Sequence, residues 1–289
     1  MQNAMTTRTI GNRRVGAIGL GAMPMSVADH MPDEAQSIRT IHAALDAGVT
    51  LIDTADAYSP SHQDVGHNER IVARALSLWS GDVGAVLVAT KGGHTRTPGG
   101  GWDRDGRPAY LKSACDRSLK ALGVDSIGLY QHHRPDPDVP YEETIGALKD
   151  LHDAGKIQMA GISNANPEQI RLAHGILGDR LVSVQNEYSP RFRSSEPEID
   201  VCAELGLAFL PWSPLGGIGR TGELSGHNAA FAEIAAARGV SPQQVCLAWE
   251  LARSPVVVPI PGASRPETIL DSVAAAGLEL TEEELARLG

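Results

Sequence analysis

The chain has 289 residues, with 25 Lys or Arg against 35 Asp or Glu, so its formal net charge is −10. With 42% hydrophobic and 21% charged residues, its composition is that of a folded globular protein and excludes a disordered chain. The acidic balance disfavours nucleic acid and anionic membranes as partners, because both reward a basic surface.

Short apolar runs alternate with longer stretches of helical period along the chain. In chain order, the runs predict eight strands, at Val15–Leu20, Thr50–Asp53, Ala85–Thr90, Ile127–Gln131, Met159–Ile162, Val182–Gln185, Ala208–Pro211 and Val256–Pro259. The stretches between and after them predict helices at Glu34–Ala47, Glu69–Leu78, Ala109–Leu122, Glu142–Ala154, Pro167–Leu177, Glu196–Leu205, Pro242–Leu251, Pro266–Ala276 and Thr281–Leu288.

Strands that alternate with helices are expected to run parallel, because each crossover needs a helix to return the chain. Eight such units in somewhat more than about 250 residues predict a (β/α)8 TIM barrel of the α/β class, with extra helices at the C-terminus. The alternative is an open doubly wound sheet, which favours a glycine-rich phosphate turn early in the chain. Gly19–Met23 lacks the third glycine of that turn, so we expect one barrel domain over Met1–Gly289.

Two features lie outside the alternation. Thr7–Ile10 and Arg13–Val15 flank Gly11 and Asn12, a pair that favours a hairpin turn, so we expect a hairpin that caps the N-terminal end of the barrel. Gly92–Arg107 is rich in glycine and proline and is expected to be a long loop. The first six residues are expected to be disordered or a cloning remnant.

Cysteine usage and the lack of targeting signals favour the cytoplasm. Cys115, Cys202 and Cys246 are odd in number and far apart, which fits neither a disulfide framework nor a zinc site, and no metal is expected. No apolar run approaches the roughly 20 residues of a membrane helix, and the N-terminus lacks a signal-peptide pattern. The sequence leaves the oligomeric state open.

Polar residues cluster where the predicted strands end, which is where TIM barrels place their active sites. Lys91 closes an apolar strand, so its ammonium must be partly desolvated and needs a partner. Asp53 closes the neighbouring strand and can supply it, although a buried Lys–Asp pair is also a frequent structural solution. Tyr58 follows in the loop after Asp53, and a lysine beside its phenol would lower the phenol pKa. His133, at the end of the fourth strand, adds a neutral hydrogen-bond donor.

The motifs Leu51–Tyr58, Ala89–Lys91 and Leu129–Asp136, in this order, resemble those of the aldo-keto reductase superfamily. Supporting matches lie at Gly161–Asn164, Val184–Tyr188, Pro211–Leu215 and Ile260–Arg265, so that the resemblance covers the chain from about Ile10 onward. It is nearer to the aryl-alcohol dehydrogenase-like and potassium-channel β-subunit-like branch of that superfamily.

The resemblance implies an NADPH-dependent enzyme that reduces aldehydes or ketones by hydride transfer, with a catalytic tetrad of Asp53, Tyr58, Lys91 and His133. Tyr58 would be the general acid, tuned by Lys91 and Asp53, while His133 would orient and polarise the carbonyl. His132 occupies a place where relatives carry an apolar residue, and it is the less favoured candidate for the histidine role.

The resemblance also implies a nicotinamide site across the barrel mouth. Ser163, Asn164 and Gln185 would hold the carboxamide, and Trp212 would stack on the ring. Gly262, Ser264 and the start of the predicted helix after Arg265 would bind the adenosine phosphate. The full set of cofactor contacts that it implies is Gly21, Ala22, Met23, Asp53, Ser163, Asn164, Gln185, Trp212, Ser213, Pro214, Leu215, Arg220, Gly262, Ser264, Arg265, Thr268, Asp271 and Ser272.

The cofactor motif departs from the commoner family pattern near the adenosine. Thr268 stands where relatives often have Arg or Gln, and Asp271 and Ser272 replace the usual Glu and Asn. Arg265 is the remaining candidate for the 2′-phosphate, so NADPH is expected and NADH stays possible.

The substrate is expected to be a small carbonyl compound, by default an aromatic or short aliphatic aldehyde. Met23, Met25 and Tyr58 are candidates for an apolar pocket, and Arg191 and Arg193 for contacts with an acidic substrate. Three other functions stay open. They are a nucleotide-binding regulatory subunit with little turnover, a Schiff-base aldolase that uses Lys91, and, least favoured, a metal-dependent hydrolase.

Overall fold

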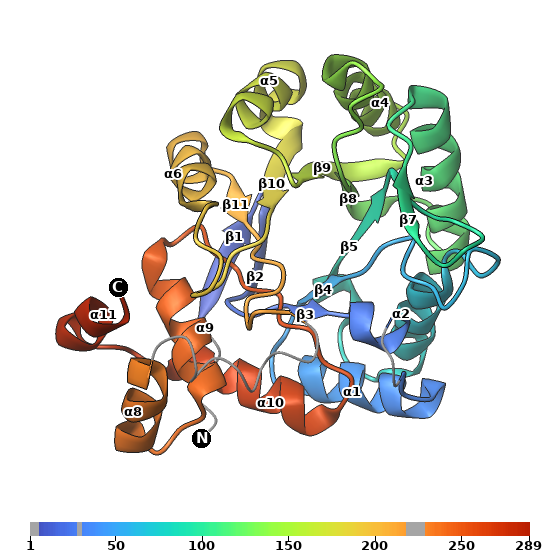
Figure 1. Ribbon diagram of the computed structural model, residues 1–289. Helices are drawn as coiled ribbons and strands as arrows, with labels where there is room; N and C mark the ends of the chain where they lie inside the picture. The colour runs from blue at the N-terminus through green and yellow to red at the C-terminus, as the bar shows by residue number, and fades with distance from the viewer. Residues whose placement is uncertain (1–5, 28–30, 218–228) are drawn as a thin grey trace.

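The structure of the protein is a computed structural model that describes residues 6–27, 31–217 and 229–289. Seven parallel strands form one curved sheet in the order β3-β4-β5-β8-β9-β10-β11. Their bounds are Leu20–Gly21, Leu51–Asp53, Leu87–Gly92, Ile127–His132, Ile157–Ser163, Leu181–Gln185 and Ala208–Phe209. The strands surround a common axis in Figure 1.

The eighth predicted strand closes the barrel through a few backbone hydrogen bonds on each side. Val258 donates its N–H to Phe209 O at 2.9 Å on one side, and Gly19 donates to Pro259 O at 2.9 Å on the other. Pro259 and Pro261 lack an N–H, which limits this segment to isolated bridges at Val257 and Gly262. The predicted (β/α)8 barrel is confirmed.

A ring of helices covers the outside of the barrel (Figure 1). In chain order they are α1 (Glu34–Asp46), α2 (His67–Leu78), α3 (Pro108–Leu122), α4 (Tyr141–Asp153), α5 (Pro167–Leu177), α6 (Glu196–Leu205), α8 (Ala229–Arg238), α9 (Pro242–Arg253), α10 (Pro266–Ala274) and α11 (Glu282–Leu288). The predicted helices agree with these bounds to within two residues at either end, and α8 is a helix that the sequence reading missed.

Local sequence signals explain where the helices begin. Asn166 and Gln169 form a capping box at the start of α5, where Pro167 takes the first helical position. Ser241 caps α9 by accepting from the N–H of Gln244. These residues satisfy backbone donors that the helix itself cannot, so the sequence specifies these boundaries.

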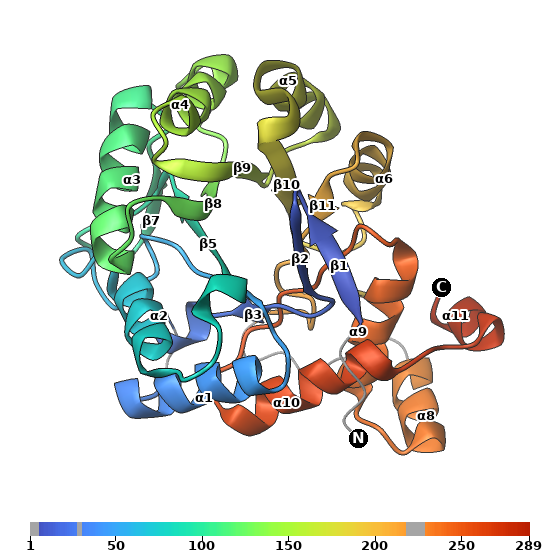
Figure 2. The ribbon, with the colours of Figure 1, turned by 180° about the vertical axis from the view of Figure 1, so that it is seen from behind.

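The predicted N-terminal hairpin is confirmed as β1 (Thr7–Ile10) paired antiparallel with β2 (Arg13–Gly16). It crosses one end of the barrel, as seen from behind in Figure 2. Gly11 makes the turn at φ 55°, and a Cβ there would lie 2.7 Å from Val182 Cγ1, so the turn sits directly on the barrel strands. Ile10 is buried in one hydrophobic cluster with residues of the barrel strands, such as Leu51 and Leu129, which gives the hairpin a packing role.

Two predictions about secondary structure are wrong. The run Val15–Leu20 is not one strand, because Val15 and Gly16 pair with β1 while the barrel strand starts only at Leu20. The stretch Gly92–Arg107 is not an irregular loop. It contains the antiparallel hairpin of β6 (His94–Arg96) and β7 (Trp102–Arg104).

All three cysteines are buried and free, and among the described residues no helix is long and apolar enough to cross a membrane. Residues 1–5 of the predicted N-terminal remnant lie outside the described part of the chain, and so does Arg220.

Candidate active site

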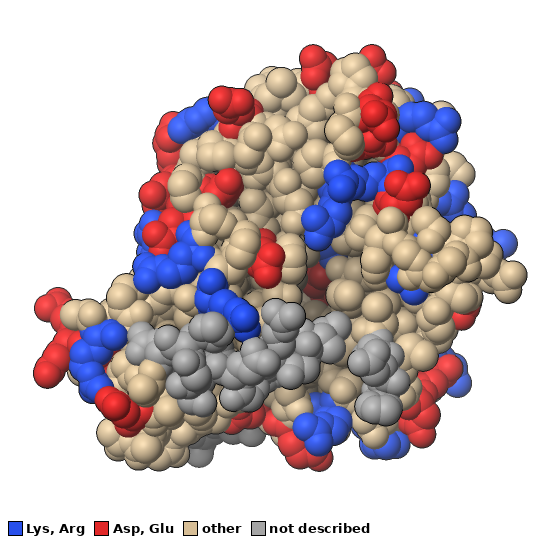
Figure 3. Space-filling model, viewed as in Figure 1, with Lys and Arg blue, Asp and Glu red and all other residues tan. Residues whose placement is uncertain are grey.

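A groove of about 920 Å³ opens at the carboxyl ends of the barrel strands. Figure 3 shows this face hollowed near its centre, with Lys or Arg side chains on the rim of the hollow. The lining includes most of the predicted site residues, namely Gly21, Met23, Asp53, Tyr58, His133, Ser163, Asn164, Gln185, Trp212, Ser213, Pro214, Leu215, Gly262, Ser264, Arg265 and Thr268. Its volume is at the upper end of the range for small-molecule sites.

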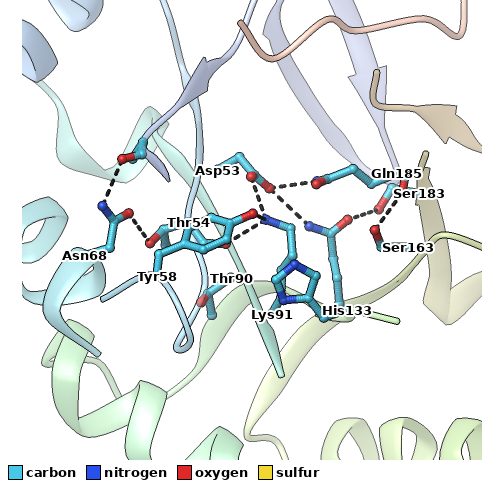
Figure 4. A network of polar contacts seen from close by, with 12 residues as sticks. Asp53, Thr54, Tyr58, Asn68, Thr90, Lys91, His133, Ser163, Ser183 and Gln185 are labelled. Atoms are coloured by element: carbon cyan, nitrogen blue, oxygen red, sulfur yellow. Dashed lines mark hydrogen bonds and ion pairs between the residues drawn. The ribbon is translucent and has the colours of Figure 1, made fainter. Parts of the chain in front are cut away.

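Lys91 lies just beneath this groove and is fully buried. It projects from β5, and Asp53 projects from the end of the adjacent β4. The ammonium donates to Asp53 Oδ2 at 2.6 Å, to Thr54 O at 2.8 Å and to Tyr58 Oη at 3.2 Å (Figure 4). All three donors of the ammonium are therefore used, and the sequence-predicted contact of Lys91 with Asp53 and Tyr58 is present.

Two amides hold the other oxygen of the Asp53 carboxylate. Gln185 Nε2 donates to Oδ1 at 2.8 Å and Gln131 Nε2 at 3.3 Å (Figure 4). The amide of Gln185, expected to face a carboxamide, thus orients Asp53 in this structure. Burial lowers the pKa of Lys91, but Asp53 and Tyr58 raise it by more, so the pKa lies above its ordinary value and the lysine stays charged.

Tyr58 lines the groove with a hydroxyl that contacts Lys91, but its pKa does not move in the predicted direction. Burial raises the pKa of the phenol above its usual value, and the Asp53 carboxylate adds to the increase. Lys91 lowers the pKa, as expected from the sequence, without offsetting burial. Tyr58 is therefore a protonated donor at neutral pH.

His133, not His132, faces the groove. Its ring lies edge-on to Tyr58 with 5.6 Å between centroids, and its backbone N–H donates to Gly92 O at 2.9 Å. Burial, together with the charge of Lys91, holds the pKa of His133 well below its usual value, so the imidazole is neutral. His132 is fully buried on the opposite side, beside Tyr141.

Ser163, Asn164 and Trp212 form a connected set on the far side of the groove. The Asn164 amide donates to Ser163 Oγ at 2.9 Å, and Trp212 Nε1 donates to Asn164 Oδ1 at 3.2 Å. Asn164 and Ser213 have positive φ angles of 58° and 51°, a conformation that costs energy outside glycine and clusters at functional sites.

The other end of the groove meets the N-terminus of α10. Ser264, Arg265 and Thr268 line it there, and no side chain caps the helix. Free N–H groups and the helix dipole make such an end a favourable place for a phosphate.

Comparison with known proteins agrees with this geometry. The model of the Aldo/keto reductase family matches residues 17–289. The chain belongs to the aldo-keto reductase family. It is 33% identical over 301 residues to a probable aldo-keto reductase 1 of Glycine max, which covers 95% of this chain and 84% of that protein.

Other relatives support the same assignment to an oxidoreductase. An uncharacterized oxidoreductase of Schizosaccharomyces pombe is 32% identical, over 98% of this chain and 88% of its own. An aldo/keto reductase from Klebsiella pneumoniae, solved with NADP and acetate, has a TM-score of 0.82 and 29% identity, with 99% of this chain and 94% of that chain covered.

Some expected contacts of this aldo-keto reductase do not reach the groove. Ala22 is fully buried behind Gly21 and Met23. Asp271 instead accepts from Ser241 Oγ at 2.7 Å and from Gln244 Nε2 at 2.6 Å, and Ser272 is buried and bonded to Thr268 O. Their side chains are engaged with α9 and α10, so any contact with the adenine needs a rearrangement.

The substrate side of the groove differs most from the sequence prediction. Met25 is buried in the outer core, and Arg193 is paired with Glu196 at 2.8 Å and stacked on Trp249. The wall consists instead of the β6–β7 hairpin, where His94 stacks on Trp102 with 4.6 Å between centroids. Two short, mostly polar runs around the turn Pro98–Gly101 were the only available signal for this hairpin.

Proposed function

We propose that this aldo-keto reductase uses NADPH to reduce aldehydes and ketones to alcohols, with Tyr58 as the general acid. One observation carries the proposal. A buried ammonium, on Lys91, donates at once to Asp53 and to a phenol that lines the groove. A hydroxyl in this position can give its proton to a carbonyl oxygen as negative charge develops there.

Each residue of the tetrad has a separate task in this proposal. Tyr58 donates the proton, and Lys91 stabilises the phenolate that remains. Asp53 keeps Lys91 in place and charged, since its own two oxygens are fixed by Lys91 and the two glutamine amides. His133 is neutral, so it can donate a hydrogen bond that orients the carbonyl without competing for its proton.

The hydrogen-bond donors and the aromatic ring that line the groove are suited to a dinucleotide. Asn164 and Ser163 offer amide and hydroxyl groups, Trp212 offers a flat ring, and the uncapped start of α10 offers backbone N–H groups beside Arg265. Bound NADPH would supply the hydride, and the relative from Klebsiella pneumoniae was solved with NADP. The residues of this chain would fix its orientation at the barrel mouth and hold the reacting carbonyl beside Tyr58.

Two alternatives make different demands on Lys91 and on turnover. A Schiff-base aldolase needs a neutral, accessible amine, whereas Lys91 is buried, engaged in three hydrogen bonds and raised in pKa. A regulatory subunit would bind the nucleotide without steady turnover. Oxidation of NADPH by benzaldehyde, measured as loss of reduced-nicotinamide absorbance, tests the enzyme, and its absence over a broad panel of carbonyl compounds would favour the regulator.

The proposal predicts different pH profiles for the two directions of reaction. Because burial raises the pKa of Tyr58 above its usual value, about 10, the phenol is protonated at and below neutral pH. We expect kcat/KM for benzaldehyde reduction to stay flat from pH 6 to 8 and to fall only as pH rises through the phenol pKa. Oxidation of benzyl alcohol needs the phenolate, so it should rise with pH.

The same profiles also test His133. Its lowered pKa keeps the imidazole neutral across this range, so reduction should show no step near about 6.5, where an ordinary histidine titrates. A step there in wild type, absent in His133→Gln, would contradict the role of a neutral histidine.

Arg265 should select between the two nicotinamide cofactors. If its guanidinium binds the 2′-phosphate, Arg265→Ala should weaken NADPH binding roughly 10-fold and leave NADH binding nearly unchanged, as expected for a lost charged hydrogen bond. Quenching of tryptophan fluorescence by each nucleotide measures both affinities. Trp212→Phe should remove most of the quenching, while Trp249→Phe, buried against Tyr188, is the matched control. An equal loss for NADH and NADPH in Arg265→Ala would argue against the assignment.

A further inference from the structure

Arg134 is an unused cation at the substrate end of the groove. It follows His133 directly, lines the groove and is partly exposed. Among the residues that the structure describes, none forms an ion pair or a hydrogen bond with its guanidinium. The guanidinium instead lies over the face of Trp212, with 5.7 Å from its carbon to the ring centroid.

Arg134 lies close to the residues of the proposed reaction. Its charge lowers the pKa of both Tyr58 and His133, the two groups that would receive the carbonyl oxygen. It also packs over Trp212, on which the nicotinamide is proposed to stack. A group that contacts Arg134 is therefore part of the same small molecule that presents its carbonyl to Tyr58.

The charge around Arg134 is positive, whereas the net charge of the whole protein is negative. The chain carries a formal charge of −10, yet Arg104 lines the groove near Arg134. Burial, together with the charge of Arg104, lowers the pKa of Arg134. Two acidic groups lie in the vicinity, Glu187 and Asp103. They offset part of the positive charge, which suits a monoanion better than a dianion such as a phosphate ester.

We propose that Arg134 binds a carboxylate of the substrate, and that the protein therefore prefers carbonyl compounds that carry a carboxylate near the reacting aldehyde or ketone. This rests on the proposed reduction of carbonyls at Tyr58. A guanidinium presents two parallel N–H donors to a carboxylate, an arrangement that holds the substrate in one orientation. Partial burial strengthens the contact, because water competes less well there.

The shape of the wall is consistent with a flat substrate between the carboxylate anchor and the acid. Trp102 and His94 stack on one side, and His94 lies edge-on to His133 with 4.8 Å between centroids. Burial is the main cause that lowers the pKa of His94 to about 4, so this imidazole is uncharged at neutral pH. His94 and Trp102 thus offer an aromatic face suited to a flat ring, between charged residues of the same hairpin such as Asp103 and Arg104.

Two isosteric aldehydes test the proposal. 3-Carboxybenzaldehyde and 3-nitrobenzaldehyde match in shape, but only the first carries a charge. We expect Arg134→Gln to reduce kcat/KM for 3-carboxybenzaldehyde roughly 10- to 100-fold, mainly through KM, the size expected for a lost bond between charged groups. The change for 3-nitrobenzaldehyde should be less than about threefold. Arg134→Lys should recover part of the loss, since lysine restores the positive charge but not the two parallel N–H donors of the guanidinium.

Arg104→Gln is the matched control, because it removes an equal charge from the more exposed rim. It should change the preference between the two aldehydes much less than Arg134→Gln does. Equal losses for both aldehydes in Arg134→Gln would overturn the proposal and indicate that Arg134 supports Trp212 or Tyr58 instead. No change for either aldehyde would overturn it as well.

The experiment separates this proposal from the proposed function. If wild type reduces 3-nitrobenzaldehyde but shows no preference for the carboxylate that depends on Arg134, the substrate proposal is contradicted and the proposed function is not. If neither aldehyde is turned over, calorimetric titration with the same two aldehydes still tests Arg134. Selective binding of the carboxylate that is lost in Arg134→Gln would then support the site, and equal binding of both would overturn it.

Discussion

Replacing Tyr58 by Phe should lower kcat for benzaldehyde reduction by about 10²- to 10⁴-fold, the usual contribution of a positioned general acid. The variant removes one oxygen and keeps the ring that lies edge-on to His133. Binding of NADPH should therefore be nearly unchanged, and the loss should appear in kcat rather than in KM. Steady-state kinetics together with fluorescence titration measure both quantities.

Tyr141→Phe is the matched control for this experiment. Its hydroxyl is buried and has no hydrogen-bond partner among the described residues, and it lies beside His132 outside the groove. It should retain near wild-type activity. Equal activity losses in Tyr58→Phe and Tyr141→Phe would indicate a structural effect and would contradict the role of general acid.

Replacing Lys91 by Met should destabilise the protein by about 3–5 kcal/mol, because it leaves the Asp53 carboxylate buried without its cation. It should also lower activity, since the phenolate of Tyr58 loses the ammonium that stabilises it. Denaturant unfolding of the wild type and the variant, compared at constant slope, gives the change in the free energy of unfolding.

Two further variants identify the cause of that destabilisation. Lys91→Met combined with Asp53→Asn should recover part of the stability, because the double variant buries no unpaired charge, while activity should stay low. Lys112→Met removes a surface pair with Asp150 whose side chains are 45% and 60% exposed, and it should cost about 0–1 kcal/mol. A Lys91→Met variant no less stable than Lys112→Met would refute the buried-pair account.

The barrel and the pairing of Asp53 with Lys91 were predictable because they depend on short-range patterns. Apolar runs fix the strands, and parallel strands bring their carboxyl ends together, so Asp53 and Lys91 had to meet once β4 and β5 were neighbours. The family motifs then suggested Tyr58 and His133, and both residues line the groove. Each of these inferences needs only the order of elements, not their detailed packing.

The features that were missed depend on tertiary packing. The net rise in the pKa of Tyr58 reflects how deeply the ring is buried, which the sequence does not reveal. The contact of Gln185 with Asp53 joins residues 132 positions apart. Arg134 stood in a recognised motif, but its lack of a partner is visible only once the surrounding side chains are placed. Arg191 and Arg193 were the sequence candidates for an acidic substrate, yet Arg193 is paired with Glu196.

Irregular pairing explains the remaining differences in the fold. The last barrel strand contains Pro259 and Pro261, which interrupt its hydrogen bonds without displacing it. The β6–β7 hairpin is short and surrounds a turn of glycines, so composition alone favours a loop. Four of its residues line the groove, namely His94, Trp102, Asp103 and Arg104, so they are candidates for substrate contacts outside the family motifs.

The central claim is that a protonated phenol at the barrel mouth supplies the proton for carbonyl reduction. Single-turnover mixing of the protein and NADPH with excess benzaldehyde tests it most directly, with reduced nicotinamide and benzyl alcohol both followed in time. We expect stoichiometric loss of NADPH and formation of alcohol in wild type, and the same reaction slowed by at least about 10²-fold in Tyr58→Phe. Alcohol formed at the wild-type rate by Tyr58→Phe, or no alcohol formed by wild type, would contradict the account.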